Sequence, residues 1–341
     1  MATLTGDGGL DNRGRDRRPR SAAQPLGRRR LIGGAAAVGL GAAAGVLGGW
    51  AAAPGAARAA QMTGVSGRPV PVGHGREIWL ESSGSGGPVV VLESGYHDGA
   101  SVWFLEDLLS PAAGPPVFPG LAATNQVIAY YRPGTLDYTA SPPKVNTKSS
   151  PAHMPRTAAD VVADLHTALA RAGVPAPYVL VAHSLGGLFS RLYAQTHPGQ
   201  VAGLVLVDSF STRVPALMGT QWPAYRRLLN QPGIPQDTQP GWEVIDIDKS
   251  VAQLAAAPPP RAGMPLAVLS KTEPFPVPAG EKGFSPARLQ KVWNQTQNEL
   301  PALEPGTPHM IATGSDHYIQ VRAPDLVIAA TRLVLGRTRR K

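Results

Sequence analysis

The stretch that decides the fold is PYVLVAHSLGG, residues 177–187. Its apolar run, residues 178–182, stops abruptly before Ser184, and the residues two positions before and after this serine are very small. A sharp turn from a buried strand into a helix has this pattern, because its strained backbone leaves no room for large side chains at those positions. We therefore expect Ser184 to be a nucleophile raised clear of a sheet, with the backbone N–H of Leu185 directed at a developing oxyanion.

The same pattern also occurs in ordinary turns between a strand and a helix. Ala182 stands where the G-x-S-x-G motif has its first glycine, although alanine is still small enough for the turn. The interpretation of Ser184 therefore depends on the rest of the chain.

The composition is that of a globular protein with a large core. Of the 341 residues, 43% are hydrophobic and 16% are charged. The chain has no cysteine, which excludes disulfides, thiol nucleophiles and thiolate metal sites. It also has no H-E-x-x-H motif and no cluster of possible ligands, so we expect no metal and no cofactor.

The net charge of +9 is concentrated at the two ends of the chain. Nine arginines and three aspartates among residues 1–59 account for six of these charges, and basic residues recur at positions 337–341. The body of the chain is therefore close to neutral. Because no basic face with a binding motif is visible, we expect no nucleic-acid partner.

The N-terminal segment has the features of an export signal. An arginine-rich leader ends in RRRLI, residues 28–32, and an uncharged stretch follows over residues 31–53. Residues 57–59 fit a small-x-small cleavage site, and the paired arginines resemble a twin-arginine signal. An uncleaved membrane anchor is the alternative, but the stretch is rich in Ala and Gly and only weakly hydrophobic. We predict a signal peptide over 1–59 and an exported, secreted or envelope-associated protein.

The remaining chain alternates apolar runs with amphipathic segments, as a sheet with crossover helices does. A helix is expected from a cap at Thr157 to Gly173, another from Leu185 to Thr196, and a last one from about Pro324. Eight strands are expected at residues 70–72, 76–82, 88–93, 126–131, 178–182, 204–208, 265–270 and 309–313.

Residues 210–263 interrupt this alternation. They include Trp222, Tyr225 and Trp242 and two weakly amphipathic stretches, so we expect a small helical cap that offers apolar surface to a substrate. A structureless loop of this length is uncommon inside a compact domain. The alternative is a surface insertion without a role in binding. The two stretches lie at residues 219–230 and 242–257.

The chain from about residue 70 to 335 resembles the α/β-hydrolase superfamily. Besides residues 177–187, the segments that carry this resemblance are YRPG at 131–134 and VAGLVLVDS at 201–209. The family's order of a strand, an oxyanion loop, a nucleophile turn and a late histidine is also present. The resemblance implies an α/β fold with a mostly parallel sheet in one domain, residues 60–341.

The resemblance also implies the other site residues. His317, on the loop after the last expected strand, corresponds to the family's catalytic base. The glycine turn after residues 88–93 corresponds to the oxyanion loop, which makes the backbone N–H of Tyr96 the second donor. Here the sequence reads Ser94-Gly95-Tyr96 where many relatives have His-Gly-x.

Two residues compete for the role of the catalytic acid. The usual place after the seventh strand gives Glu273, and the place used by some members, the end of the sixth strand, gives Asp208. Either carboxylate could accept a hydrogen bond from the Nδ1–H of the histidine and so fix which tautomer is present. We prefer Asp208, because it ends a strong strand cleanly whereas Glu273 lies among prolines.

These residues together predict a serine hydrolase that works through an acyl-enzyme intermediate. The expected substrate is a small or medium, uncharged and apolar carboxylic ester. A peptidase, a thioesterase or a cofactor-free haloperoxidase would use the same residues. A binding protein that keeps the scaffold without turnover is the alternative from another class.

Overall fold

The computed structural model describes residues 57–59, 64–108, 112, 114–277 and 280–339. Most of the predicted signal peptide, residues 1–56, lies outside the described residues, so export stays a prediction. Its last residues form β1 (Ala57–Ala59), which pairs antiparallel with β5 (Leu105–Asp107). No helix among the described residues is both long enough and apolar enough to cross a membrane.

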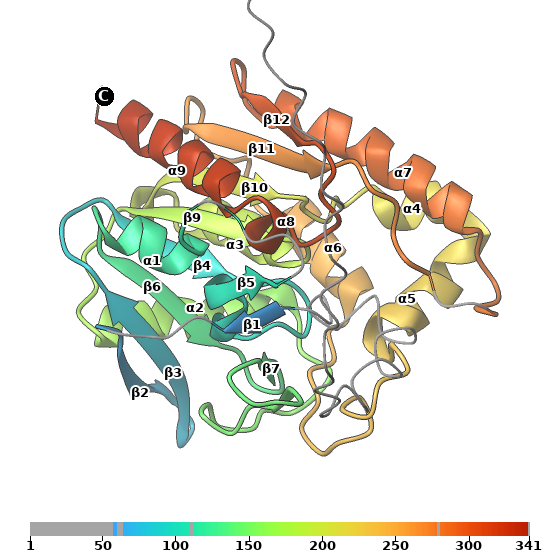
Figure 1. Cartoon of the computed structure of the whole chain (residues 1–341), viewed down its shortest axis with the longest axis horizontal. Helices are drawn as coiled ribbons and strands as arrows, with labels where there is room; N and C mark the ends of the chain where they lie inside the picture. Colours follow the sequence, from blue (N-terminus) through green and yellow to red (C-terminus); the bar gives the residue numbers. More distant parts are fainter. Residues whose placement is uncertain (1–56, 60–63, 109–111, 113, 278–279, 340–341) are drawn as a thin grey trace, which may run out of the picture. The chain divides into compact units, whose positions relative to one another are not determined.

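An eight-stranded sheet forms the centre, in the order β12-β11-β10-β9-β4-β6-β3-β2 (Figure 1). β2 and β3 pair antiparallel, as do β3 and β6, whereas the other neighbours run parallel. The predicted fold class is confirmed. The strands are β2 (Ser66–Gly73), β3 (Arg76–Ser83), β4 (Val89–Glu93), β6 (Val127–Tyr131), β9 (Tyr178–His183), β10 (Val201–Val207), β11 (Leu266–Lys271) and β12 (His309–Ala312).

Each of these strands overlaps a run expected from the sequence. The parallel strands at the centre are continuous apolar runs because helices cover both of their faces, and β4, β6, β9 and β10 are buried throughout. A short hairpin of β7 (Leu136–Asp137) and β8 (Lys144–Val145) was not expected. Strands of this length carry too few residues to show an alternating pattern.

Helices cover the sheet on both faces, and each face has its own core. On one face pack α1 (Val117–Ala122), α8 (Ile319–Arg322) and α9 (Pro324–Thr338). On the other face pack α2 (Ala158–Arg171), α3 (Gly186–Thr196) and α7 (Pro286–Glu299). Neighbouring residues of one strand serve opposite cores, because successive side chains point to opposite faces.

The start of α2 agrees with its sequence signal. The Thr157 hydroxyl accepts a hydrogen bond from the Asp160 N–H, and the Asp160 carboxylate accepts one from the Thr157 N–H. This reciprocal pair is a capping box, which satisfies N–H groups that have no partner inside the helix. The expected bounds of this helix and of α3 differ from the observed ones by one or two residues.

Three helices lie between β10 and β11: α4 (Val214–Met218), α5 (Trp222–Asn230) and α6 (Ile247–Ala256). α6 begins later than expected because Asp246 caps it, accepting a hydrogen bond from the Lys249 N–H. All three helices contribute to the core that contains α2 and α3. We call residues 210–263 the insertion.

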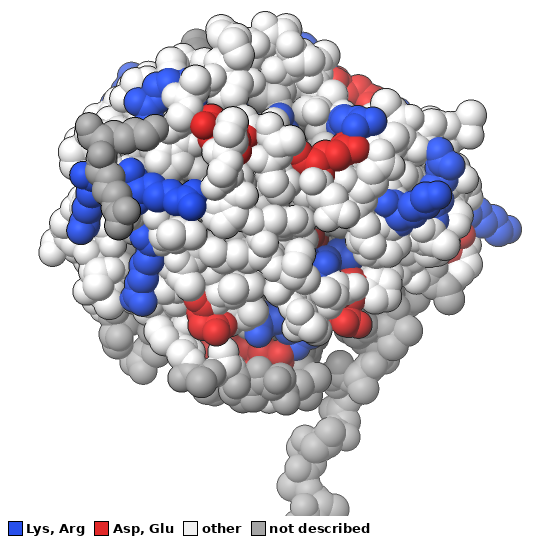
Figure 2. Space-filling view, turned by 90° about the horizontal axis from the view of Figure 1, so that it is seen from above, with Lys and Arg blue, Asp and Glu red and all other residues white. Residues whose placement is uncertain are grey.

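Charged side chains form no single-sign field on the face drawn in Figure 2. Basic and acidic side chains are interspersed there among a larger uncharged surface. This distribution agrees with the near-neutral charge expected for the body of the chain.

Candidate active site

Three residues far apart in sequence meet at the carboxyl edge of the parallel strands. The Ser184 Oγ lies 2.9 Å from His317 Nε2, and His317 Nδ1 lies 2.6 Å from Asp208 Oδ2. Because a carboxylate only accepts, Nδ1 carries the proton and Nε2 is free to accept from the serine hydroxyl. An imidazole held in this way can act as a general base toward the serine.

Ser184 sits on the sharp turn between β9 and α3, with a left-handed φ of 51°. The turn is tied to the end of β10: the Ser184 N–H donates to Val207 O, and the Phe210 N–H donates to Ser184 O. A Cβ on Gly186 would lie 2.5 Å from Ser94 O, so no larger residue fits there. Steric crowding therefore explains why the residue two positions after the serine is a glycine, as expected from the sequence.

Asp208 follows the last residue of β10 and is fully buried. Its second oxygen, Oδ1, accepts from the Trp293 indole N–H at 3.0 Å and from the Lys271 N–H at 3.3 Å. Trp293 belongs to α7 and packs edge-on against the His317 ring. Sequence reasoning missed this residue, although Ser285-Pro286 is a recognisable helix start.

The other acid candidate, Glu273, and Asp316, which precedes His317 in the sequence, have different partners. Glu273 is exposed, and its carboxylate accepts from the neighbouring Thr272 hydroxyl. The Asp316 carboxylate accepts from the Tyr318 N–H and from Arg322. Of the three carboxylates, the structure therefore brings Asp208 to His317 and directs the other two to different partners.

The loop after β4, residues 94–97, packs directly against the serine turn. A Cβ on Gly95 would lie 2.6 Å from His183 Nδ1, so this glycine allows the close approach. The backbone N–H groups of Tyr96 and Leu185 have no acceptor within the part of the chain that the structure describes. Both residues line the same pocket as Ser184.

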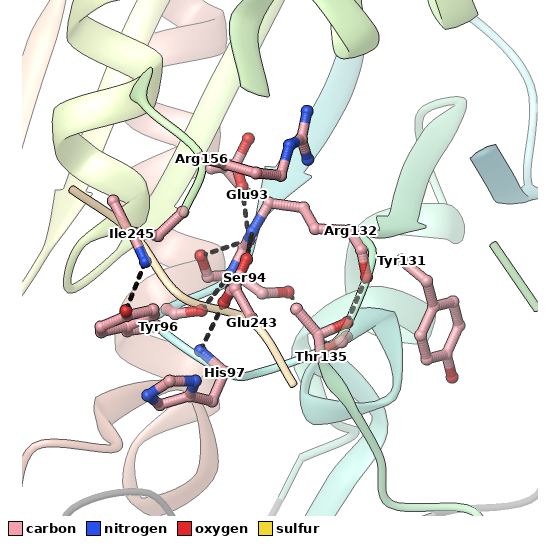
Figure 3. A network of polar contacts seen from close by, with 12 residues as sticks. Glu93, Ser94, Tyr96, His97, Tyr131, Arg132, Thr135, Arg156, Glu243 and Ile245 are labelled. Atoms are coloured by element: carbon pink, nitrogen blue, oxygen red, sulfur yellow. Dashed lines mark hydrogen bonds and ion pairs between the residues drawn. The ribbon is translucent and has the colours of Figure 1, made fainter. Parts of the chain in front are cut away.

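A buried ionic network supports this loop (Figure 3). Arg132, which is 1% exposed, donates to Glu93 Oε1 and to Glu243 Oε1, each at 2.7 Å. Burial alone would lower the pKa of Arg132, but the two carboxylates raise it above its ordinary value, so the guanidinium stays charged. The same side chain donates to the backbone oxygens of Ser94 and Gly95.

The pocket above Ser184 encloses about 520 Å³ of space, its open mouth included. Of the three aromatic residues expected from the insertion, Tyr225 lines it. Trp222 is instead buried and donates its indole N–H to the Asp248 carboxylate, and Trp242 stacks on His97. The largely apolar wall comes from both the insertion and the main domain: Phe210, Tyr225, Leu228, Leu229, Phe275 and Trp293.

The polar side of the pocket holds two more histidines and one carboxyl group. Burial lowers the pKa of His97 to about 4 and lowers that of His183 well below its ordinary value. Their Nε2 atoms lie 2.7 and 2.8 Å from the backbone oxygens of Leu229 and His317, respectively. Burial also raises the pKa of Asp98 to about 7. At neutral pH both imidazoles are uncharged.

Among the described residues, no group of three or more histidine, aspartate or glutamate side chains could hold a metal ion. The arrangement around Ser184 is a hydroxyl, an imidazole and a carboxylate joined by hydrogen bonds, with the backbone N–H groups of Leu185 and Tyr96 at the same pocket.

Comparison with known proteins agrees with this fold. Residues 108–240 match the family described as alpha/beta hydrolase fold, and the strand order and the serine turn are as that fold requires. The chain has the α/β-hydrolase fold. The family resemblance expected from the sequence is thereby confirmed.

Solved structures similar to this α/β-hydrolase chain extend over most of its length. A provisionally assigned lipase from Acinetobacter baumannii is 18% identical, with a TM-score of 0.51 over 82% of this chain and 93% of that one. The haloalkane dehalogenase DatA from Agrobacterium tumefaciens is 16% identical, with a TM-score of 0.52 over 81% and 97%. At these identities the likeness shows the fold alone.

One curated sequence relative is an uncharacterized protein of Schizosaccharomyces pombe. It is 38% identical over 100 residues, which cover 28% of this chain and 16% of the relative. The chain therefore spans about a sixth of the length of that relative, as far as the two match.

Proposed function

We propose that this α/β-hydrolase chain is a serine hydrolase that cleaves uncharged carboxylic esters. The observation that carries the proposal is the hydrogen-bonded series Ser184–His317–Asp208 at an apolar pocket. The three groups that acyl transfer needs, a nucleophile, a base and an orienting carboxylate, are each within hydrogen-bonding distance of the next.

In the first half of the reaction, His317 Nε2 takes the proton of Ser184 as Oγ attacks the ester carbonyl carbon. The carbonyl oxygen becomes an oxyanion, which the N–H groups of Leu185 and Tyr96 stabilise. The tetrahedral intermediate then collapses. The bond to the alcohol oxygen breaks, and the His317 imidazolium protonates the leaving alcohol.

In the second half, His317 removes a proton from a water molecule that attacks the acyl carbon. The ester bond to Ser184 Oγ breaks, His317 returns the proton to Oγ, and the carboxylic acid leaves. Asp208 does not change its protonation state. It holds the Nδ1–H of His317 and stabilises the imidazolium formed in each half.

The pocket favours an uncharged substrate. Among the residues that line it there is no lysine, arginine or glutamate, and its one carboxyl group, Asp98, is neutralised in part because burial raises its pKa to about 7. An ionic acyl group would lose its hydration without gaining a partner. We therefore assign small to medium apolar esters as the substrate class.

The test replaces the nucleophile. Ser184→Ala should abolish hydrolysis of p-nitrophenyl butyrate, because the remaining groups cannot form the acyl-enzyme, while circular dichroism stays that of the wild type. A fluorophosphonate probe should label the wild type at Ser184 and leave the variant unlabelled. Undiminished turnover by the pure variant would contradict the proposal.

A probe of this kind also separates the proposed enzyme from a binding protein on the same scaffold, which would take up no label. A peptidase, a thioesterase and a cofactor-free haloperoxidase would all label. A panel of p-nitrophenyl esters, thioesters and anilides of matched acyl chains distinguishes the first two from an esterase, and a bromination assay tests the third.

A further inference from the structure

We infer that Arg132 and Glu243 position the peptide whose N–H is the second oxyanion donor, so that the insertion completes the oxyanion site. The inference rests on the proposed function and gives two residues outside the reacting groups a role in catalysis. Arg132 follows β6, and Glu243 lies in the insertion between α5 and α6.

Arg132 holds the peptide between Gly95 and Tyr96 by its carbonyl end. Its Nη2 donates to Gly95 O at 2.6 Å. In a planar trans peptide the C=O and N–H bonds point in opposite directions, so fixing this carbonyl fixes the direction of the Tyr96 N–H. A cation at the carbonyl also polarises the peptide and makes its N–H a stronger donor.

Glu243 holds both Arg132 and the next peptide of the loop. Its side chain is 0% exposed. Oε1 accepts from Arg132 Nε at 2.7 Å, and Oε2 accepts from the backbone N–H of His97 at 2.8 Å. The carboxylate therefore bonds the peptide after Tyr96 directly and, through Arg132, is linked to the peptide before it (Figure 3).

Other parts of the insertion reinforce this contact. The Ile245 N–H donates to the Tyr96 hydroxyl at 2.6 Å, and that hydroxyl also bonds Asn230. The Trp242 ring stacks on His97 at 4.1 Å between centroids. Tyr96 and His97 are the central residues of a turn that the hydrogen bond from the Asp98 N–H to Gly95 O closes, and His97 O also accepts from the Leu136 N–H. The contacts from the insertion add to these bonds and restrict the turn further.

The experiment compares Glu243→Gln with the matched variant Glu81→Gln. Glu81 is also a buried glutamate in an ion pair, with Lys148, but it lies on β3 away from the loop. We expect Glu243→Gln to lower kcat for p-nitrophenyl butyrate by about 10- to 100-fold, as loss or misplacement of an oxyanion donor does. KM should stay within about twofold, and Glu81→Gln should leave kcat unchanged.

A second readout reports on the oxyanion directly. An aryl trifluoromethyl ketone adds to the serine and leaves an oxyanion in the site, so its inhibition constant should rise in Glu243→Gln by the same factor as kcat falls. Rates are counted per active site, from complete labelling with the fluorophosphonate. A residue with a purely structural role would lower the melting temperature and leave both quantities unchanged.

The outcomes are distinct. Activity lost in Ser184→Ala but unchanged in Glu243→Gln would overturn this inference and leave the proposed function standing, whereas an inactive wild type would overturn both. If Glu243→Gln does not fold, Glu243→Asp replaces it, because the shorter carboxylate keeps the charge but cannot reach Arg132 and His97 together. Failure of both variants to fold, with Glu81→Gln folded, would assign Glu243 to folding and also overturn the inference.

Discussion

At the scale of single residues, the site combines strained backbone with side chains that hydrogen bonds hold in place. Ser184 and Asp208 both have left-handed φ angles, of 51° and 41°, which cost of order 1–3 kcal/mol each for a residue other than glycine. Each turn is held by hydrogen bonds to the end of a neighbouring strand. The strain is therefore retained because the sheet determines both positions, and it presents the two side chains to His317.

Asp98 gives a prediction on pH dependence. Its carboxyl group is buried and accepts a hydrogen bond from the Tyr138 hydroxyl, and burial raises its pKa to about 7, with Arg132 and Glu243 acting in opposite senses. The folded state therefore binds a proton that the unfolded state releases near pH 4. Stability from this group is present at low pH and is lost as the pH rises toward 7, by up to about 1.4 kcal/mol per pH unit.

The measurement is the free energy of unfolding of wild type and Asp98→Asn, from urea titrations between pH 4.5 and 8.5. The amide keeps the acceptor for Tyr138 and removes the titration. The difference in stability, wild type minus variant, should fall with rising pH up to about 7 and then level off. A difference that is constant across this range, or rises, would contradict the raised pKa.

At the scale of elements, the sequence predicted what depends on local pattern. All eight strands of the main sheet were expected. The signal is clearest for β4, β6, β9 and β10, because buried parallel strands are continuous apolar runs. α7 was missed, since a helix with the sequence PARLQKVWNQTQNE shows few apolar positions. The sequence favoured Asp208 over Glu273 only through the way each segment ends, because which carboxylate lies beside His317 depends on the folded sheet.

The ionic network of Arg132 with Glu93 and Glu243 could not be predicted from the sequence, for a related reason. Arg132 and Glu243 are 111 positions apart, and no local pattern indicates that two such residues are buried together. A buried glutamate in a loop looks like a solvated charge in the sequence. The catalytic roles of Ser184, His317, Asp208, Leu185 and Tyr96 remain predictions that mutagenesis has to test.

The start of α3 gives a prediction for an element. A Cβ on Gly186 would lie 2.5 Å from Ser94 O and 2.8 Å from Glu93 O, and both neighbours are backbone atoms that cannot rotate away. Gly186→Ala should therefore push α3 away from the loop after β4, with a loss of about 1–3 kcal/mol in stability. The loss should come with a strong decrease in kcat.

Gly336→Ala is the matched control, because this glycine lies within α9 and a Cβ there would meet nothing within 4 Å. This change should raise the stability by about 0.5–1 kcal/mol, since alanine is the better helix former. Urea unfolding and ester hydrolysis of the two variants give both quantities. Equal stability and activity in the two variants would show that the turn is looser than these distances imply.

At the scale of the whole described unit, one sheet joins two cores and carries the site along one edge. Ser94, Ser184, Asp208 and His317 all follow the carboxyl ends of strands. Adjacent residues of β4 serve different cores: Val91 faces the core of α2 and α3, and Val90 faces the core of α1 and α9. Neither core can loosen without disturbing the strands that position the site.

This coupling predicts that the two cores unfold together and that activity is lost in the same transition. Val90 and Val91 are both 0% exposed, and truncation of either to alanine removes buried methyl groups and leaves a cavity, which should cost about 2–3 kcal/mol. We expect Val90→Ala and Val91→Ala to shift one urea transition, seen alike by tryptophan fluorescence and by hydrolysis of p-nitrophenyl butyrate. Since Trp103 belongs to one core and Trp293 to the other, fluorescence reports on both. A variant in which activity survives a first fluorescence transition would show that the cores are independent, and the site would then depend on one face of the sheet alone.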